Sequence, residues 1–115
     1  MFKDFSFDKG LRLRKYSEFK AVYAEQKKAT GRSLIVYFKP DNVTRFGVIV
    51  SKKVDKRAVK RNKIKRRIRE IFRCNKPDLT GDYVIISNTF AKDPSFEELK
   101  QDWLTQLAYL KRKYG

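Results

Sequence analysis

Hydrophobic residues near the start of this chain recur with the period of a helix. Phe19, Val22 and Tyr23 stand at positions i, i+3 and i+4, which places them on one side of a helix. Ser17, just before them, is a residue type that often caps a helix N-terminus. The pattern therefore predicts a first helix that begins at Ser17 and ends before Thr30-Gly31.

The next two stretches have the composition and alternation of β-strands. Residues 33–39 are rich in branched and aromatic side chains and end at the turn-forming sequence Pro-Asp-Asn. Alternation places Leu34, Val36 and Phe38 on one face, which we expect to be the core face, and Tyr37 on the more polar face. Residues 45–51 predict a second strand, which we expect to pair antiparallel with the first through a short loop.

The second half of the chain predicts a helix, a strand and a final helix. Apolar residues at helical spacing predict a helix that ends near Asn75. These residues are Ile64, Ile68, Ile71 and Phe72. Residues 82–87 form a continuous apolar run, which predicts a strand buried on both faces. Ser95 and Glu98 have the spacing of a capping box and open the last helix. We expect the buried stripe of that helix to contain Leu99, Trp103, Leu107 and Leu110.

The order helix, strand, strand, helix, strand, helix predicts an α+β fold. We expect a small sheet with helices packed mainly on one face, in a single domain that spans residues 1–115. The second and third strands are joined through a helix, so they run parallel if they pair within one sheet.

Charge is the property that most narrows the function. The 115 residues contain 29 Lys and Arg against 13 Asp and Glu, which gives a net charge of +16. Self-repulsion of this size disfavours the compact isolated chain and indicates a polyanionic partner. Nucleic acid is the first candidate and an anionic membrane surface is the second. The membrane surface is disfavoured, because the apolar stripe of the predicted central helix contains no Trp and is needed for the core.

The residues that the chain lacks exclude several function classes. It contains no histidine, which excludes a Ser/His/Asp triad and an HExxH zinc site. The lone Cys74 can form neither an intrachain disulfide nor a Cys-rich zinc site, which is typical of a reducing cytoplasm. No apolar run reaches the roughly 18 residues of a membrane span, and the first residues lack the apolar stretch of a secretory signal. We therefore expect a cytoplasmic protein.

Most of the positive charge is concentrated around the predicted central helix. The segment from Lys52 to Arg73 contains twelve Lys and Arg and only two acids. An ordinary solvated helix face mixes signs and gains a few tenths of a kcal/mol per i, i+4 pair, whereas this segment repels itself. We therefore favour phosphate binding over a solvated face. On a helical wheel, the polar face carries Asn62, Lys65, Arg66, Arg69 and Arg73, while Arg61 falls on the apolar side in the first turns.

Three aromatic residues have two possible roles. Phe19 and Tyr23 on the first helix, and Tyr37 on the polar face of the first strand, have rings on which an unpaired base can stack. An aromatic stripe at helical spacing is more often core packing, and the period alone favours that interpretation for Phe19 and Tyr23. For Tyr37 the pattern favours neither core packing nor base stacking over the other.

The central segment resembles the signature of the bacterial ribonuclease P protein component. The resemblance rests on Val50-Ser51-Lys52-Lys53 and on the run AVKRNKIKRRIRE from Ala58 to Glu70. Further matches at residues 13–15, 19–23, 32–37 and 82–86 extend it over nearly the whole chain. It implies an αβββαβα-type fold, similar in shape to ribosomal protein domains, with one more short strand than the pattern predicts. It also implies a left-handed βαβ crossover, an exception to the usual handedness.

The resemblance also implies a function. Proteins of that family join a large catalytic RNA in a ribonucleoprotein, ribonuclease P, which acts in tRNA processing as the endonuclease that removes the 5′ leader of precursor tRNA. The RNA performs the hydrolysis with Mg²⁺, so the resemblance implies no catalytic residue, metal or cofactor on the protein itself. The implied partners are the catalytic RNA and precursor tRNA, with no membrane and no obligate protein partner.

Residue roles follow from the same resemblance, position by position. The implied RNA-binding residues are Lys52, Lys53, Arg61, Asn62, Lys65, Arg66 and Arg69. The implied aromatic residues of the leader cleft are Phe19, Tyr23 and Tyr37. Residues 54–57 correspond to a loop that is often shorter in the family, and Arg67 stands at an often apolar position. Lys56, Arg57 and Arg67 therefore receive no role.

The residues alone leave two other classes open. A general RNA-binding or ribosomal protein would use the same basic helix without serving an enzyme. A preference for precursor over mature tRNA, seen only with the catalytic RNA present, would separate the two classes. A nuclease that acts alone needs carboxylates that converge on a metal, yet the thirteen acids are scattered from Asp4 to Asp102 without paired spacing. Magnesium-dependent cleavage of RNA by the protein alone would support that class.

Overall fold

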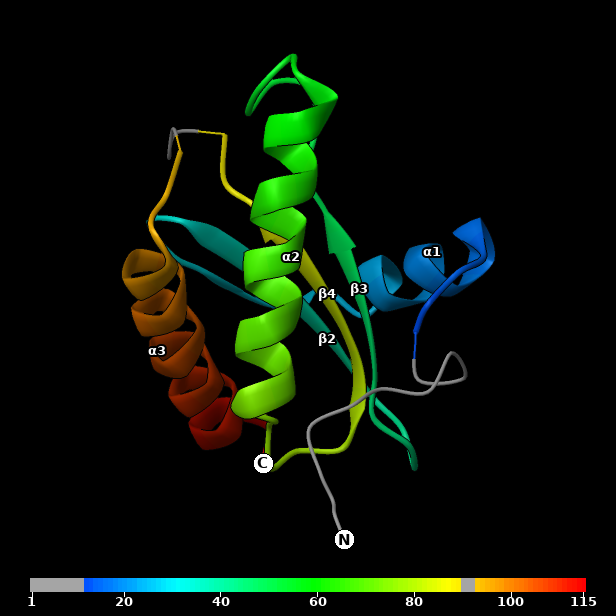
Figure 1. The fold of residues 1–115 in the computed structure, drawn as a ribbon. Helices are drawn as coiled ribbons and strands as arrows, with labels where there is room; N and C mark the ends of the chain where they lie inside the picture. The colour runs from blue at the N-terminus through cyan, green and yellow to red at the C-terminus, as the bar shows by residue number, and fades with distance from the viewer. Residues whose placement is uncertain (1–11, 90–92) are drawn as a thin grey trace, which may run out of the picture.

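The chain folds into a four-stranded sheet with α2 and α3 on one face and α1 on the other (Figure 1). The computed structural model describes residues 12–89 and 93–115. In chain order the elements are α1 (Tyr16–Ala24), β1 (Lys27–Thr30), β2 (Leu34–Pro40), β3 (Arg45–Ile49), α2 (Ala58–Cys74), β4 (Gly81–Ser87) and α3 (Phe96–Tyr114). The α+β class is confirmed, and β1 is the additional short strand that the family resemblance implied.

The first helix is shorter than the hydrophobic pattern predicts. α1 ends at Ala24 rather than just before Thr30. Gln26 then adopts a φ of 55°, a left-handed conformation that turns the chain out of the helical path. Residues 27–30 pair antiparallel with β2 instead, although the pattern assigned the first three of them to the helix.

The strands follow the order β1-β2-β4-β3 in the sheet, so β2 and β3 are not neighbours. The predicted antiparallel pairing of these two strands is therefore wrong. β4 lies between them, antiparallel to β2 and parallel to β3. β4 is the most fully buried strand, and its burial on both faces agrees with the prediction. A central position removes more of its apolar surface from water than an edge position would.

β3, α2 and β4 form a crossover between two parallel strands. In Figure 1 both strands run upward, α2 lies in front of the sheet, and β4 lies to the left of β3. A path that leaves β3, passes down the front through α2 and enters a strand on the left is left-handed. Such connections are rare, and this one agrees with the handedness that the resemblance implied.

The two faces of the sheet have cores of different size. On the α1 face, a small cluster surrounds Leu13, Val22 and Val84. On the other face, the predicted stripe of α2 is fully buried, and in the predicted stripe of α3 only Leu107 is partly exposed. That larger core contains Leu34, Val36, Phe38, Phe46, Ile64, Ile68, Ile71, Phe72, Tyr83, Ile85, Leu99, Trp103 and Leu110. Most of the hydrophobic stabilisation therefore comes from the α2–α3 face.

Polar contacts fix the position of α3. The predicted capping box is present: the amide of Glu98 donates to Ser95 Oγ at 3.1 Å, and the amide of Ser95 donates to Glu98 Oε1 at 2.9 Å. Further along the helix, the Asp102 carboxylate accepts the amide of Leu34 at 3.0 Å, and Gln106 Nε2 donates to the carbonyl of Leu34 at 2.9 Å. α3 is therefore tied to the start of β2 as well as packed on the sheet.

Candidate nucleic-acid interface

α2 lies over one face of the sheet (Figure 1). Its apolar stripe is buried in the core, and its polar side faces solvent. Asn62 and Arg66 are exposed, and Lys65 and Arg69 are half-buried. None of these four side chains makes a hydrogen bond or ion pair with any residue in the described ranges. We call Asn62, Lys65, Arg66 and Arg69 the basic face.

Among residues 12–89 and 93–115, no acid pairs with a cation of the basic face. Glu70, the one acid within α2, pairs with Arg73, which removes Arg73 from the unpaired cations of the predicted wheel. Burial and the nearby guanidinium of Arg12 lower the pKa of Arg69. Like charges held together in this way repel one another. Bound phosphate groups would relieve that repulsion.

Arg61 has a different environment from the basic face. Its guanidinium donates to the backbone carbonyls of Asp55 at 3.1 Å and of Lys56 at 2.8 Å. These bonds hold the loop that follows β3 against the first turns of α2. The sequence pattern did not reveal this bracing contact, and the RNA-binding role of Arg61 stays a prediction.

Lys52 and Lys53 lie in the turn between β3 and α2, and both are exposed. In Figure 1 this turn stands at the upper end of α2, beyond its first residue. The two lysines therefore extend the line of positive charge past the N-terminus of the helix.

Two cations without a predicted role make local structural contacts. Arg57 pairs with Asp55 at 3.0 Å, and its hydrogen bonds lower the pKa of the Asp55 carboxyl to about 2. Arg67 donates to the carbonyl of Pro94 at 2.8 Å and so links α2 to the residues before α3. The charge of both side chains is therefore engaged within the protein.

The three predicted aromatic residues lie together on the α1 face of the sheet. Tyr23 and Tyr37 meet edge to face with ring centroids 4.9 Å apart, and Phe19 belongs to the same cluster. Phe19 covers Gly47 so closely that a side chain there would collide with the ring. Lys28 Nζ lies 5.6 Å from the centre of the Tyr37 ring. All three rings are half-buried, so each contributes to the core and also offers surface to a ligand.

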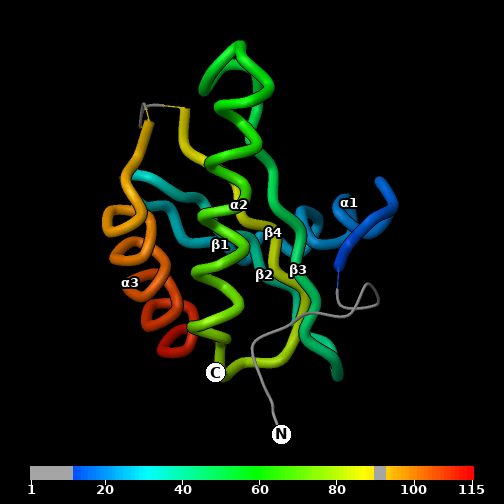
Figure 2. Tube along the Cα trace, in the orientation of Figure 1, coloured from blue at the N-terminus to red at the C-terminus, as the bar shows by residue number. Residues whose placement is uncertain are grey.

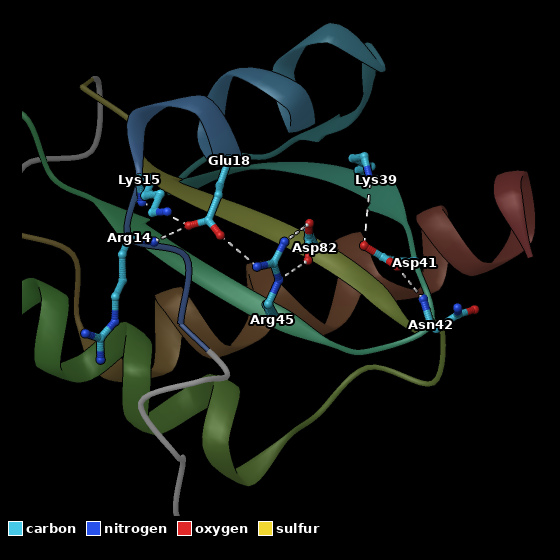
Figure 3. A network of polar contacts seen from close by, with 8 residues as sticks. All are labelled: Arg14, Lys15, Glu18, Lys39, Asp41, Asn42, Arg45 and Asp82. Atoms are coloured by element: carbon cyan, nitrogen blue, oxygen red, sulfur yellow. Dashed lines mark hydrogen bonds and ion pairs between the residues drawn. The ribbon is translucent and has the colours of Figure 1, made fainter.

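A charged network fixes α1 against the sheet (Figure 3). Arg45 donates to both carboxylate oxygens of Asp82, at 2.9 Å each, and to Glu18 at 2.8 Å. The Asp82 side chain is only 3% exposed, so Arg45 supplies the charge that its burial requires. The sequence analysis missed this network. The available signal was that Arg45 opens β3 and that Asp82 is the second residue of β4, where the parallel register places the two opposite charges side by side.

Glu18 also sets the start of α1. Its carboxylate accepts the amides of Arg14 at 2.8 Å and Lys15 at 2.9 Å. These two bonds, followed by that from Arg45, lower the pKa of Glu18 to about 2. The helix therefore begins at Tyr16, and the predicted N-cap at Ser17 is wrong.

The segment before α1 connects the two faces of the sheet along the outer edge of β3. The amide of Leu13 donates to the carbonyl of Phe46 at 2.8 Å, and Arg12 forms a parallel bridge with the same residue. Arg12 is close enough to Arg69 to affect its pKa. Positive charge therefore continues from α2 around this edge toward α1.

The chemical groups gathered here are ammonium, guanidinium and aromatic rings, which bind phosphates and nucleic-acid bases. Across residues 12–89 and 93–115, no group of three or more acids or cysteines is placed to hold a metal ion. Within the same ranges, every helix is too short or too polar to cross a membrane. Fold and surface together define a basic α+β protein whose exposed groups suit nucleic acid.

Comparisons with known proteins identify the family. The ribonuclease P family model matches residues 7–111. The ribonuclease P protein component of Staphylococcus carnosus is 39% identical over 98 residues, which cover 82% of this chain and 84% of that protein. The corresponding protein of a Pseudanabaena species is 38% identical over 109 residues, which cover 90% and 94%.

Solved structures agree with the sequence relatives. The RNase P protein of Staphylococcus aureus matches with a TM-score of 0.78 and 32% identity, covering 88% of this chain and 95% of that one. The protein of Thermotoga maritima matches with a TM-score of 0.76 and 30% identity, covering 90% and 98%. This chain therefore belongs to the ribonuclease P protein family.

Proposed function

We propose that this chain is the subunit of ribonuclease P that binds both the catalytic RNA and the 5′ leader of precursor tRNA, and so assists 5′ maturation. The observation that carries the proposal is the basic face of α2. Lys65, Arg66 and Arg69 have no acid partner in the described ranges, in a chain whose family is that of ribonuclease P. RNA phosphates supply the missing negative charge.

The basic face, together with Lys52 and Lys53, contacts the backbone of the catalytic RNA. Cations between two RNA strands lower the repulsion that opposes their approach. Hydrolysis belongs to the RNA and its Mg²⁺ ions, and the protein contributes affinity and alignment.

The α1 face holds the leader. Phe19, Tyr23 and Tyr37 offer ring surface to unpaired bases, while Lys28 lies beside Tyr37 to meet the backbone. Stacking is tolerant of sequence because every base has a π-face, so one surface serves leaders of different sequence. The Arg45 network keeps α1, and with it Phe19 and Tyr23, at a fixed distance from the sheet.

The test is reconstitution with a bacterial catalytic RNA and labelled precursor tRNA. We expect the Arg66→Gln/Arg69→Gln variant to bind the catalytic RNA about tenfold more weakly at moderate salt, with a log–log salt slope shallower by about 1.4. The control, Lys100→Gln/Lys111→Gln, removes the same charge from α3. Equal losses in both variants would show a general charge effect and contradict the assignment of the basic face.

Two further measurements separate the other classes. A general RNA-binding protein would show the same preference between precursor and mature tRNA whether or not the catalytic RNA is present. We instead expect a preference for precursor tRNA that requires the catalytic RNA. We also expect no magnesium-dependent cleavage by the protein alone.

A further inference from the structure

β1 and α3 lie beside each other at the sheet edge opposite β3 (Figure 2). A groove lies between them. Its volume is about 420 Å³, and it is lined by Lys28, Ala29, Thr30, Thr105, Gln106 and Tyr109. β1 is an edge strand, so one wall of the groove is the strand's outer edge and the other wall is α3. The wall residues combine hydroxyl, amide, ammonium and aromatic groups, which is a mixture that suits a nucleotide better than a purely apolar ligand.

The backbone of β1 adds polar groups to this groove. The amide of Gly31 donates to the carbonyl of Leu34, which identifies a hydrogen-bonded pair of the β1–β2 ladder. Hydrogen-bonded and non-hydrogen-bonded pairs alternate in an antiparallel ladder. The N–H and C=O groups of Lys28 and Thr30 therefore point away from β2, toward the outer edge where the groove lies.

Cations surround the aromatic wall of the groove. The Tyr109 ring has the Arg112 guanidinium 5.7 Å from its centroid and Lys113 Nζ at 5.6 Å. Lys113 also donates to the Tyr109 hydroxyl at 3.2 Å. Neither Arg112 nor Lys113 has an acid partner in the described ranges, whereas Lys111 on the same helix pairs with Asp78 at 2.8 Å. In these ranges the positive charges of Arg112 and Lys113 beside Tyr109 are therefore uncompensated, whereas the charge of Lys111 is compensated by Asp78.

Lys28 joins the groove to the α1 face. It lines the groove, and its Nζ also lies 5.6 Å from the centre of the Tyr37 ring on the α1 face. The two surfaces therefore meet across a strand of four residues, Lys27–Thr30. A chain that passes over Tyr37 reaches the groove by crossing this narrow strand.

We propose that single-stranded RNA on the α1 face continues over β1 into the α3 groove, where a base stacks on Tyr109 and phosphates meet Lys28, Arg112 and Lys113. The inference rests on the proposed function and extends it, because the groove would take the part of the leader farther from the cleavage site. A protein strand that adds to β1 is the competing occupant. The shortness of β1 and its two lysines disfavour strand addition.

Two labelled oligouridylates, of about 5 and about 12 nucleotides, test the proposal by fluorescence anisotropy with the full chain. We expect the wild type to bind the longer probe more tightly. Tyr109→Ala should weaken binding of the longer probe at least fivefold, by about the value of one stacked base, and leave the shorter probe unchanged. Tyr109→Phe keeps the ring and should behave as the wild type. Lys111→Gln, the charge control, should change neither affinity.

A second variant covers the case in which Tyr109→Ala fails to fold. Arg112→Gln/Lys113→Gln alters exposed side chains and should also weaken only the longer probe. Wild-type affinity of both variants for both probes would overturn the proposal and favour a protein strand at β1. Equal weakening of both probes by the groove variants would overturn the proposal as well. The short probe would then also depend on the groove, so the groove would not be a continuation of the α1 face.

Tyr37→Ala separates failure of this inference from failure of the proposed function. If Tyr37→Ala weakens both probes while the groove variants change neither, the α1 face binds RNA and the inference falls. If the groove variants weaken the longer probe while Tyr37→Ala changes neither affinity, the groove is supported and the leader role of the α1 face is contradicted.

Discussion

On the α2–α3 face of the sheet, aromatic side chains are fully buried against one another, whereas on the α1 face they stay half-exposed. Phe46 and Phe72 stack with centroids 4.7 Å apart, and Phe72 meets Trp103 at 5.2 Å, all three almost without exposure. On the α1 face, Tyr23 and Tyr37 contact edge to face and keep part of their rings in solvent. α2 and α3 together thus bury the aromatic rings of one face completely, whereas α1 alone leaves part of the ring surface exposed on the other face.

The largest expected effect is on the buried face. Trp103→Ala should lower the free energy of unfolding by about 3 to 5 kcal/mol, because it leaves a cavity among Phe72 and Tyr83 and removes the bond from the indole to the Asn75 carbonyl. Urea unfolding followed by circular dichroism measures this loss. Tyr37→Ala on the α1 face should cost less than half as much. Equal losses would mean that the two faces do not differ as described.

The next effect tests the join between α1 and the sheet. Arg45→Met should lower the free energy of unfolding by about 3 kcal/mol, because it leaves the buried Asp82 carboxylate without its partner. Adding Asp82→Asn should recover part of the loss, since the buried charge is then absent. If the double variant is no more stable than Arg45→Met, the unpaired charge is not the cause.

A smaller effect depends on pH. The pKa of Glu18 is lowered from 4.5 to about 2 in the folded protein, so its stabilisation is complete above pH 4.5 and is lost as the pH falls through about 2. Glu18→Gln should therefore reduce stability by about 1 to 2 kcal/mol at neutral pH. The difference from the wild type should shrink between those two pH values. Glu97→Gln is the control, and a difference for Glu18→Gln that does not change with pH would contradict the network.

The smallest effect distinguishes two cations of one helix. If about five to eight phosphates are neutralised, the log–log salt slope for binding of the catalytic RNA should lie at about −4 to −6. Lys65→Gln should make it shallower by about 0.7, because that side chain has no partner in the part of the chain that the structure describes. Arg67→Gln should leave the slope unchanged, because Arg67 is bound to the Pro94 carbonyl. A change of equal size in both variants would show that internal pairing does not decide which cations meet RNA.

Elements set by local patterns could be predicted from the sequence. The stripe of α2, the capping box at Ser95 and the double burial of β4 follow from residues close together in the chain. β1 was missed because Lys-Lys-Ala-Thr has no period of its own and the turn at Gln26 uses a left-handed conformation without glycine. The place of β4 between β2 and β3 was missed because it depends on pairing between distant segments.

In the candidate site, too, residues placed by local spacing could be predicted, whereas contacts with loops or distant segments could not. The basic face could be located by helical spacing, because the period of α2 alone places its members away from the buried apolar stripe. The bracing role of Arg61 could not, since its partners are backbone carbonyls of a loop whose path the sequence does not define. The Arg45 network requires the parallel register of β3 and β4, which becomes known only with the sheet order.

The position of β4 also has a consequence for synthesis of the chain. β3 forms its ladder with β4, which follows α2 in the sequence, so β3 has no complete partner strand until residue 87 has left the ribosome. By then all the cations of α2 have already emerged. A nascent chain therefore presents its strongest attraction for RNA before the sheet that positions it exists.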